Sequence, residues 1–81
     1  SQQAFGKVKV YPNPNNGLVY VETDDFNGIE IKITDIQGRL LNTLTMNEIK
    51  TRISLEEYAA GTYILKLKKG DLHNLYKIIK E

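Results

Sequence analysis

The side chains that could carry out covalent or acid–base chemistry are few in this 81-residue chain. Acyl transfer needs a hydroxyl or thiol nucleophile beside a base. The sequence offers one imidazole, two serines and no cysteine, namely His73, Ser1 and Ser54. Asp71 and His73 share one face of an extended segment, but a solvated pair beside a turn is the ordinary form of that spacing. One histidine cannot supply the converging ligands of a zinc site. We therefore expect no catalytic residue, no metal centre and no cofactor.

The acidic side chains allow one further kind of chemistry. Asp24, Asp25 and Asn27 group oxygen atoms in one loop, and oxygen is the ligand that calcium prefers. Their spacing is not that of an EF-hand, and Asp and Asn also cap turns by bonding nearby backbone, so both interpretations stay open. The adjacent pairs Asp24-Asp25 and Glu56-Glu57 cannot oppose each other across the roughly 5–10 Å that glycosidase carboxyl groups need. The six glycines are scattered and form no phosphate-binding loop.

Charge and hydropathy exclude further classes of function. Eleven basic and ten acidic residues leave a formal charge of +1, which disfavours binding to nucleic acid. No apolar stretch approaches the ~20 residues of a membrane-spanning helix. From Lys66 onward, however, five lysines and two acidic residues leave a net charge of +3. A solvated outer face explains this basic end, and so does a docking surface for an acidic partner.

The elements that position these residues are strands. Polar and apolar residues alternate with period two, and Pro, Asn, Asp and Gly interrupt the alternation at intervals typical of a sandwich. We expect strands over residues 7–11, 18–22, 29–34, 40–46, 49–55, 61–68 and 72–80. At 9.2 kDa the chain holds one domain, so these predict an all-β, immunoglobulin-like sandwich of about seven antiparallel strands in two sheets. Ser54 and Glu57 have the spacing of a capping box on one helical turn. Tyr63 either forms a tyrosine corner with upstream backbone or fills the core.

Four segments resemble, in order and spacing, the C-terminal sorting domain of proteins exported by the type IX secretion system of Bacteroidetes. The segments are residues 11–17 (YPNPNNG), 35–40 (DIQGRL), 55–65 with Ala60-Gly61-Thr62-Tyr63, and 77–80 (KIIK). The resemblance covers residues 8–81. It implies an immunoglobulin-like domain that ends a larger cargo protein and that the outer-membrane translocon recognises after periplasmic folding. A sortase-like peptidase then removes the domain and can link the cargo to lipopolysaccharide at the cell surface.

The resemblance carries over to individual positions. Residues that match the family motifs are Pro12, Asn13, Pro14, Gly17, Asp35, Gly38, Gly61 and Tyr63, together with Lys77, Ile78, Ile79 and Lys80. The first three groups lie in turns whose backbone requires Pro or Gly, so folding alone can account for them. Under this interpretation residues 7–81 form the sorting domain and residues 1–6 are a linker or an expression remnant. Cleavage is expected upstream of Lys7.

Recognition is better sought in the terminal strand. Leu75 and Ile79 fall on one side of it and Tyr76 and Ile78 on the other, so both faces are apolar. An exposed edge strand of this kind can be recognised by strand addition, and it can also pair with a second copy to form a homodimer. The predicted recognition residues are Leu72, Leu75, Tyr76, Lys77, Ile78, Ile79 and Lys80. The alternative function is a non-cleaved carbohydrate-binding or spacer module, which should show several exposed aromatic side chains on one sheet face.

Overall fold

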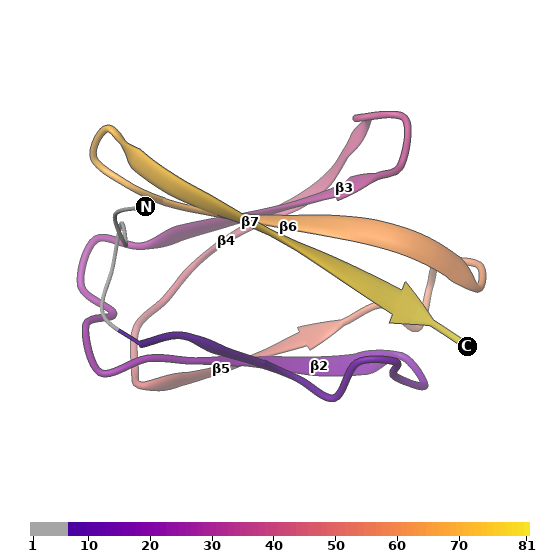
Figure 1. Ribbon diagram of the computed structural model, residues 1–81, viewed down its shortest axis with the longest axis horizontal. Coiled ribbons are helices and arrows are strands. Elements are labelled where there is room, and N and C mark those ends of the chain that lie inside the picture. Colours follow the sequence, from indigo (N-terminus) through magenta and orange to yellow (C-terminus); the bar gives the residue numbers. More distant parts are fainter. Residues whose placement is uncertain (1–6) are drawn as a thin grey trace.

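The computed structural model describes residues 7–81, and within this range the regular structure consists entirely of strands. The predicted linker, residues 1–6, lies outside the described residues. Figure 1 shows two layers of antiparallel strands. The strands are β1 (Lys9–Tyr11), β2 (Leu18–Glu22), β3 (Glu30–Asp35), β4 (Leu40–Thr45), β5 (Lys50–Ser54), β6 (Gly61–Lys69) and β7 (Leu72–Lys80).

The strands pair in two sheets, as the sequence predicts. One sheet has the order β1-β2-β5 and the other has the order β4-β3-β6-β7. The predicted all-β sandwich of seven antiparallel strands is therefore confirmed. The fourth strand pairs with the third, whereas in constant-type immunoglobulin domains it lies on the opposite sheet. As a result the larger sheet ends at β4 on one edge and at β7 on the other.

The core lies between the sheets and follows from the period-two alternation. The inward positions of β3 and β6 are Ile31, Ile33, Leu65 and Leu67, which are all fully buried. Val19, Val21 and Ile53 cover them from the other sheet. Each such side chain contributes roughly 1.5–3 kcal/mol of transfer free energy. The outward positions of the larger sheet are polar or partly exposed, including Lys32 and Lys66.

The segment between β5 and β6 forms a turn instead of the predicted helical turn. The Ser54 hydroxyl accepts a hydrogen bond from the Glu56 backbone N–H at 3.3 Å, two residues on, so a capping box does not form. The Tyr58 N–H then bonds to the Leu55 carbonyl at 3.0 Å. The Tyr63 hydroxyl donates to the Ala59 carbonyl, which confirms the tyrosine corner. Tyr63 is also buried, so its ring fills the core as well.

Candidate functional site: the terminal edge strand

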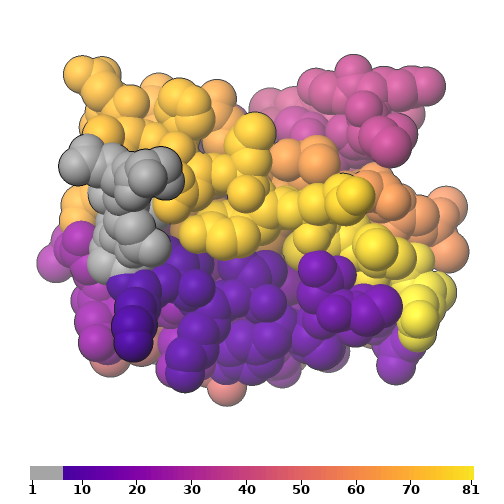
Figure 2. Space-filling view, viewed as in Figure 1, coloured from indigo at the N-terminus to yellow at the C-terminus, as the bar shows by residue number. Residues whose placement is uncertain are grey.

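The terminal strand β7 forms one edge of the larger sheet. It pairs with β6 over nine residues in regular antiparallel register, with Leu75 opposite Lys66 and Ile79 opposite Thr62. Figure 1 shows it in yellow, crossing the front of the sandwich. Figure 2 shows its side chains at the surface over much of this face. The predicted terminal strand is thus an edge strand and is not enclosed between the two sheets.

The two faces of β7 differ in burial as the sequence predicts. Ile78 is fully buried, and Tyr76 packs against the core. On the outward face Leu75 is 64% exposed and Ile79 is 39% exposed, with Lys77 exposed between them. Leu72, beside the β6–β7 turn, is also exposed. Large apolar side chains exposed along an edge strand are a common feature of protein-binding surfaces.

Two asparagines close the C-terminal half of the β7 edge. Asn13 donates from Nδ2 to the Lys77 carbonyl, and its Oδ1 accepts from the Ile79 N–H, both at 2.9 Å. Asn15 donates to the Ile79 carbonyl from its backbone N–H at 2.9 Å and from Nδ2 at 3.0 Å. The Asn15 carbonyl accepts from the Glu81 N–H at 2.8 Å. We call Asn13 and Asn15 the asparagine clamp.

The clamp depends on the conformation of its loop. Asn15 is 2% exposed, and its Oδ1 accepts from the buried Gly17 N–H at 2.8 Å. Gly17 has a φ of +122°, and a Cβ there would lie 3.1 Å from Glu56 Cγ. Its carbonyl accepts from the Leu55 N–H at 2.7 Å. The motif glycine therefore allows the loop to approach the β5–β6 corner closely while Asn15 faces β7.

The last motif lysine anchors the other side of the strand end. Lys80 Nζ donates to the Tyr58 carbonyl at 2.5 Å and to the Leu55 carbonyl at 3.0 Å. Carbonyl dipoles turned toward an ammonium group are stabilising hydrogen-bond partners. Of the predicted recognition residues, Ile78 and Lys80 therefore hold β7 in the fold, whereas Leu72, Leu75, Lys77 and Ile79 face solvent.

The four motif segments meet at one end of the sandwich. Asp35 pairs with Tyr63, which pairs with Ile78, so three motifs share one row across the sheet. Gly61 pairs with Lys80, and Asn15 forms a parallel bridge to Lys80. These segments lie together at the right-hand end of Figure 1. Sequence reasoning missed Asn15, because no local pattern indicates that a loop asparagine will be buried against a strand 64 residues away.

The middle motif builds its own turn at this end. Asp35 Oδ1 accepts from the Arg39 N–H at 2.9 Å and from the Gln37 N–H at 3.0 Å, and Oδ2 pairs with Arg39 Nε at 3.0 Å. These contacts, above all the Arg39 backbone hydrogen bond, lower the pKa of Asp35. Gly38 takes a φ of +90°. The carboxylate therefore acts as a turn cap.

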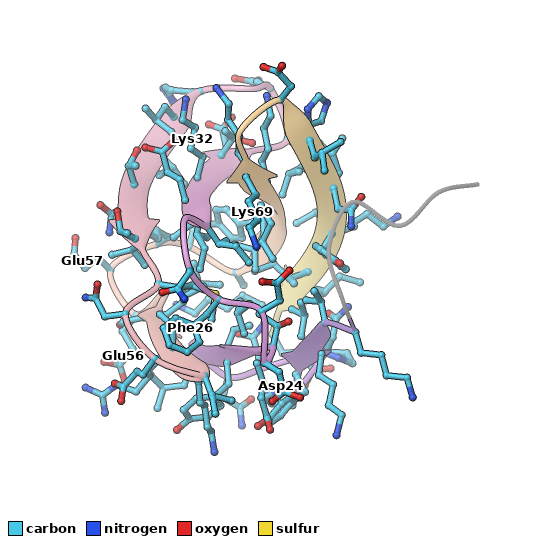
Figure 3. All side chains as sticks on the ribbon, turned by 90° about the vertical axis from the view of Figure 1, so that its left-hand side faces the viewer. Asp24, Phe26, Lys32, Glu56, Glu57 and Lys69 are labelled. Carbon is cyan, nitrogen blue, oxygen red and sulfur yellow. The ribbon has the colours of Figure 1, made fainter. Side chains whose placement is uncertain are left out.

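The other candidate sites do not assemble. Asp25 pairs with Lys69 Nζ at 2.6 Å, and Figure 3 shows Lys69 close to the loop that carries Asp24. Within residues 7–81 no three His, Cys, Asp or Glu side chains are placed to hold a metal ion. Asp71 and His73 are both exposed beside the β6–β7 turn. The described residues form no helix long and apolar enough to cross a membrane.

Comparison with known families bears on the resemblance seen in the sequence. The family model described as a secretion system C-terminal sorting domain matches residues 9–81. The chain belongs to this sorting-domain family. The match takes in all four motif segments of the sorting domain, including the clamp and the whole of β7. The family assignment therefore confirms the resemblance seen in the sequence.

The fold of the sorting domain also has a counterpart among solved structures. PorZ of Porphyromonas gingivalis, described as an essential bacterial surface component of the type IX secretion system, superposes with a TM-score of 0.76 at 24% sequence identity. The superposition covers 91% of this chain and 11% of PorZ, so the sorting domain corresponds to a small part of that protein. At this identity the similarity shows a shared fold. A search of curated proteins found no significant sequence match.

Proposed function

We propose that this sorting domain is the C-terminal export signal of a larger cargo protein, which it directs across the outer membrane through the type IX secretion system. The observation that carries the proposal is the state of β7. It is an edge strand with exposed Leu75 and Ile79, and residues of the family motifs hold it in one position. The cargo passes through the periplasm and reaches the cell surface or the medium.

The convergence of the motifs indicates that the signal is a folded surface. Asn13, Asn15 and Lys80 tie β7 to two loops that are distant in sequence. The outward row Leu75, Lys77 and Ile79 therefore takes its arrangement from the folded domain. A translocon component that binds this row would distinguish folded cargo from unfolded cargo.

The proposal includes a processing step by other proteins. A sortase-like peptidase cleaves upstream of Lys7 and can attach the cargo to lipopolysaccharide. Mass spectrometry of secreted cargo would locate the new C-terminus.

The test is secretion of a reporter fused to residues 1–81 in a host that has the export system. Deleting residues 75–81 should leave the reporter in the periplasm, but this deletion also removes the buried Ile78. The sharper variant is Leu75→Ser with Ile79→Ser, which changes two exposed side chains and leaves the core intact. Ile36→Ser is the matched control, because Ile36 is 73% exposed and lies outside β7. Undiminished secretion of both the deletion and the double variant would refute the proposal.

One observation favours the alternative function as a glycan-binding module. Tyr11 and Tyr20 lie side by side on the outer face of the smaller sheet, with ring centroids 5.8 Å apart. The Tyr11 hydroxyl donates to Glu22 at 2.6 Å, which raises the pKa of Tyr11, and Lys50 Nζ lies 4.7 Å from the Tyr20 centroid. Glycan binding predicts that Tyr11→Ala with Tyr20→Ala abolishes retention on polysaccharide. The sorting function predicts unchanged secretion of that variant.

A further inference from the structure

Only the C-terminal half of the β7 edge is closed by the clamp. The N–H and C=O groups of Ile79 point away from β6 and toward the clamp. Because these directions alternate along an antiparallel strand, the N–H and C=O groups of His73, Leu75 and Lys77 also point away from β6. Clamp contacts begin at the Lys77 carbonyl. Within residues 7–81, both backbone groups of His73 and Leu75 and the N–H of Lys77 bond to no other residue. We call residues 73–77 the open segment.

The other strand edges of the sandwich are poorer templates for a further strand. β1 has three residues. β4 is interrupted by a register shift opposite Ile33 and Thr34, which bends the edge. β5 has five residues and carries Lys50 and Arg52 on its outward face. β7 is nine residues long and pairs with β6 in regular register, so the outer edge of the open segment presents free backbone groups at regular spacing.

The sheet face beside the open segment is basic. Lys66 lies opposite Leu75, Lys68 lies opposite His73, and Lys32 lies opposite Lys66 on the next strand. With Lys77 they give four lysines, against the single acidic residue Glu30 among the outward positions of these described strands. The salt bridges of the described residues involve none of these four lysines. These four lysines can therefore attract negative charges of a partner that lie within the Debye length of about 8–10 Å.

We infer that the open segment accepts a short extended segment of an export-machinery protein, which adds as a fifth strand and carries acidic side chains on its outer face. This inference rests on the proposed function. Strand addition satisfies the free backbone groups, and carboxylates on alternate residues of the added strand face Lys77 directly and approach Lys66 and Lys68. The clamp limits pairing to residues 73–77, because Asn13 occupies the edge beyond them.

A second copy of this chain fits the site poorly. Antiparallel pairing of two β7 strands about Leu75 would place His73 of one copy beside Lys77 of the other on one face. Lys77 of each copy would then lie on the same face as Lys68 of the other, two strands or about 10 Å away. Like charges at this distance repel each other. The homodimer predicted from the sequence is thus the less favourable occupant, and size-exclusion chromatography should show a monomer.

The backbone test uses proline at an outward position. Leu75→Pro removes an N–H that faces away from β6, so the ladder to β6 keeps its hydrogen bonds. Leu75→Ala is the side-chain control. Thr45→Pro is the backbone control, because Thr45 lies on the free edge of β4. The next residue, Met46, bonds to Ile29, so the alternation of an antiparallel strand turns the Thr45 N–H away from β3. We expect Leu75→Pro to be secreted about tenfold less than Leu75→Ala, as for one lost hydrogen bond in an interface.

The charge test reverses two lysines beside the site. Lys66→Glu with Lys77→Glu should lower reporter secretion about tenfold, because the carboxylates of the partner would then face like charge. Lys50→Glu with Arg52→Glu makes the same change in net charge on the other sheet and should be secreted normally. Circular dichroism melting establishes that each variant is folded.

Secretion of Leu75→Pro at the level of Leu75→Ala would overturn strand addition. Equal secretion of the two charge variants would overturn the acidic partner. In both cases failed secretion of Leu75→Ser with Ile79→Ser would leave the export function standing. Secretion of that variant and of the deletion would reject the export function itself.

Discussion

Replacing Asn15 with alanine tests whether the asparagine clamp holds the terminal strand. The side chain is buried and makes two hydrogen bonds, to the Gly17 N–H at 2.8 Å and to the Ile79 carbonyl at 3.0 Å. In the variant the Ile79 carbonyl still accepts from the Asn15 backbone N–H, so loss of the hydrogen bond from Asn15 Nδ2 costs about 0.5–1 kcal/mol. The Gly17 N–H is buried and loses its acceptor, which costs about 1–3 kcal/mol.

Together these losses lower the free energy of unfolding by about 1.5–4 kcal/mol, out of roughly 4–12 kcal/mol for a domain of this size. The expected fall in melting temperature is roughly 6–30 °C. Urea denaturation followed by circular dichroism measures the change. In amide hydrogen exchange, Asn15→Ala should speed exchange at the Ile79 and Glu81 amides more than at the amides of buried β6 residues, relative to wild type.

Two neighbouring asparagines provide controls in the same loop. Asn13→Ala removes two exposed hydrogen bonds to β7 and should cost about 1 kcal/mol or less. Asn16 is exposed and makes no side-chain hydrogen bond within the described residues, so Asn16→Ala should stay within about 0.5 kcal/mol of wild type. If Asn15→Ala were as stable as Asn16→Ala, the Asn15 side chain would contribute nothing to the stability of the clamp.

Three further variants probe the same end of the sandwich. Because the pKa of Asp35 is lowered in the folded state, its ionised form stabilises the fold at pH values above the ordinary carboxyl pKa near ~3.9. This stabilisation is lost as the pH falls through the folded-state pKa. In urea unfolding, Asp35→Asn should therefore lose stability less steeply than wild type below about pH 4. Gly17→Ala should destabilise more than Gly38→Ala by differential scanning calorimetry, because both residues have positive φ but only the Cβ at position 17 meets a neighbour. Lys80→Met should cost about 1–2 kcal/mol in urea, against less than about 0.5 kcal/mol for the exposed Lys77→Met, because only Lys80 binds carbonyl groups.

The sequence alone predicts those parts of the fold that depend on local alternation. Ile31 with Ile33, and Leu65 with Leu67, follow period two, so their strands and inward faces could be assigned before the structure was known. Glycines and prolines mark where these strands end. The strand ends differ by one or two residues, as for the first strand, expected at 7–11 and observed at Lys9–Tyr11.

Long-range contacts are what the sequence could not supply. The spacing of Ser54 and Glu57 fits either a capping box or a simple turn, and the Gly17 contact with Leu55 and Glu56 favours the turn. Lys80 looks like one more basic residue of a solvated strand, yet its ammonium group binds carbonyls of a corner more than twenty residues earlier. Asn15 likewise acquires its role from a strand at the far end of the chain.

The half-closed edge reconciles two demands on the proposed export signal. A fully open nine-residue strand with exposed Leu75 and Ile79 would be a template for aggregation. A fully covered strand would offer a partner neither backbone nor side chains. The clamp covers the end that carries Ile79, and the lysines beside the open segment oppose pairing between copies through like charge. In the proposed strand addition the same lysines attract an acidic strand, so one arrangement of charge would both oppose self-association and select the partner.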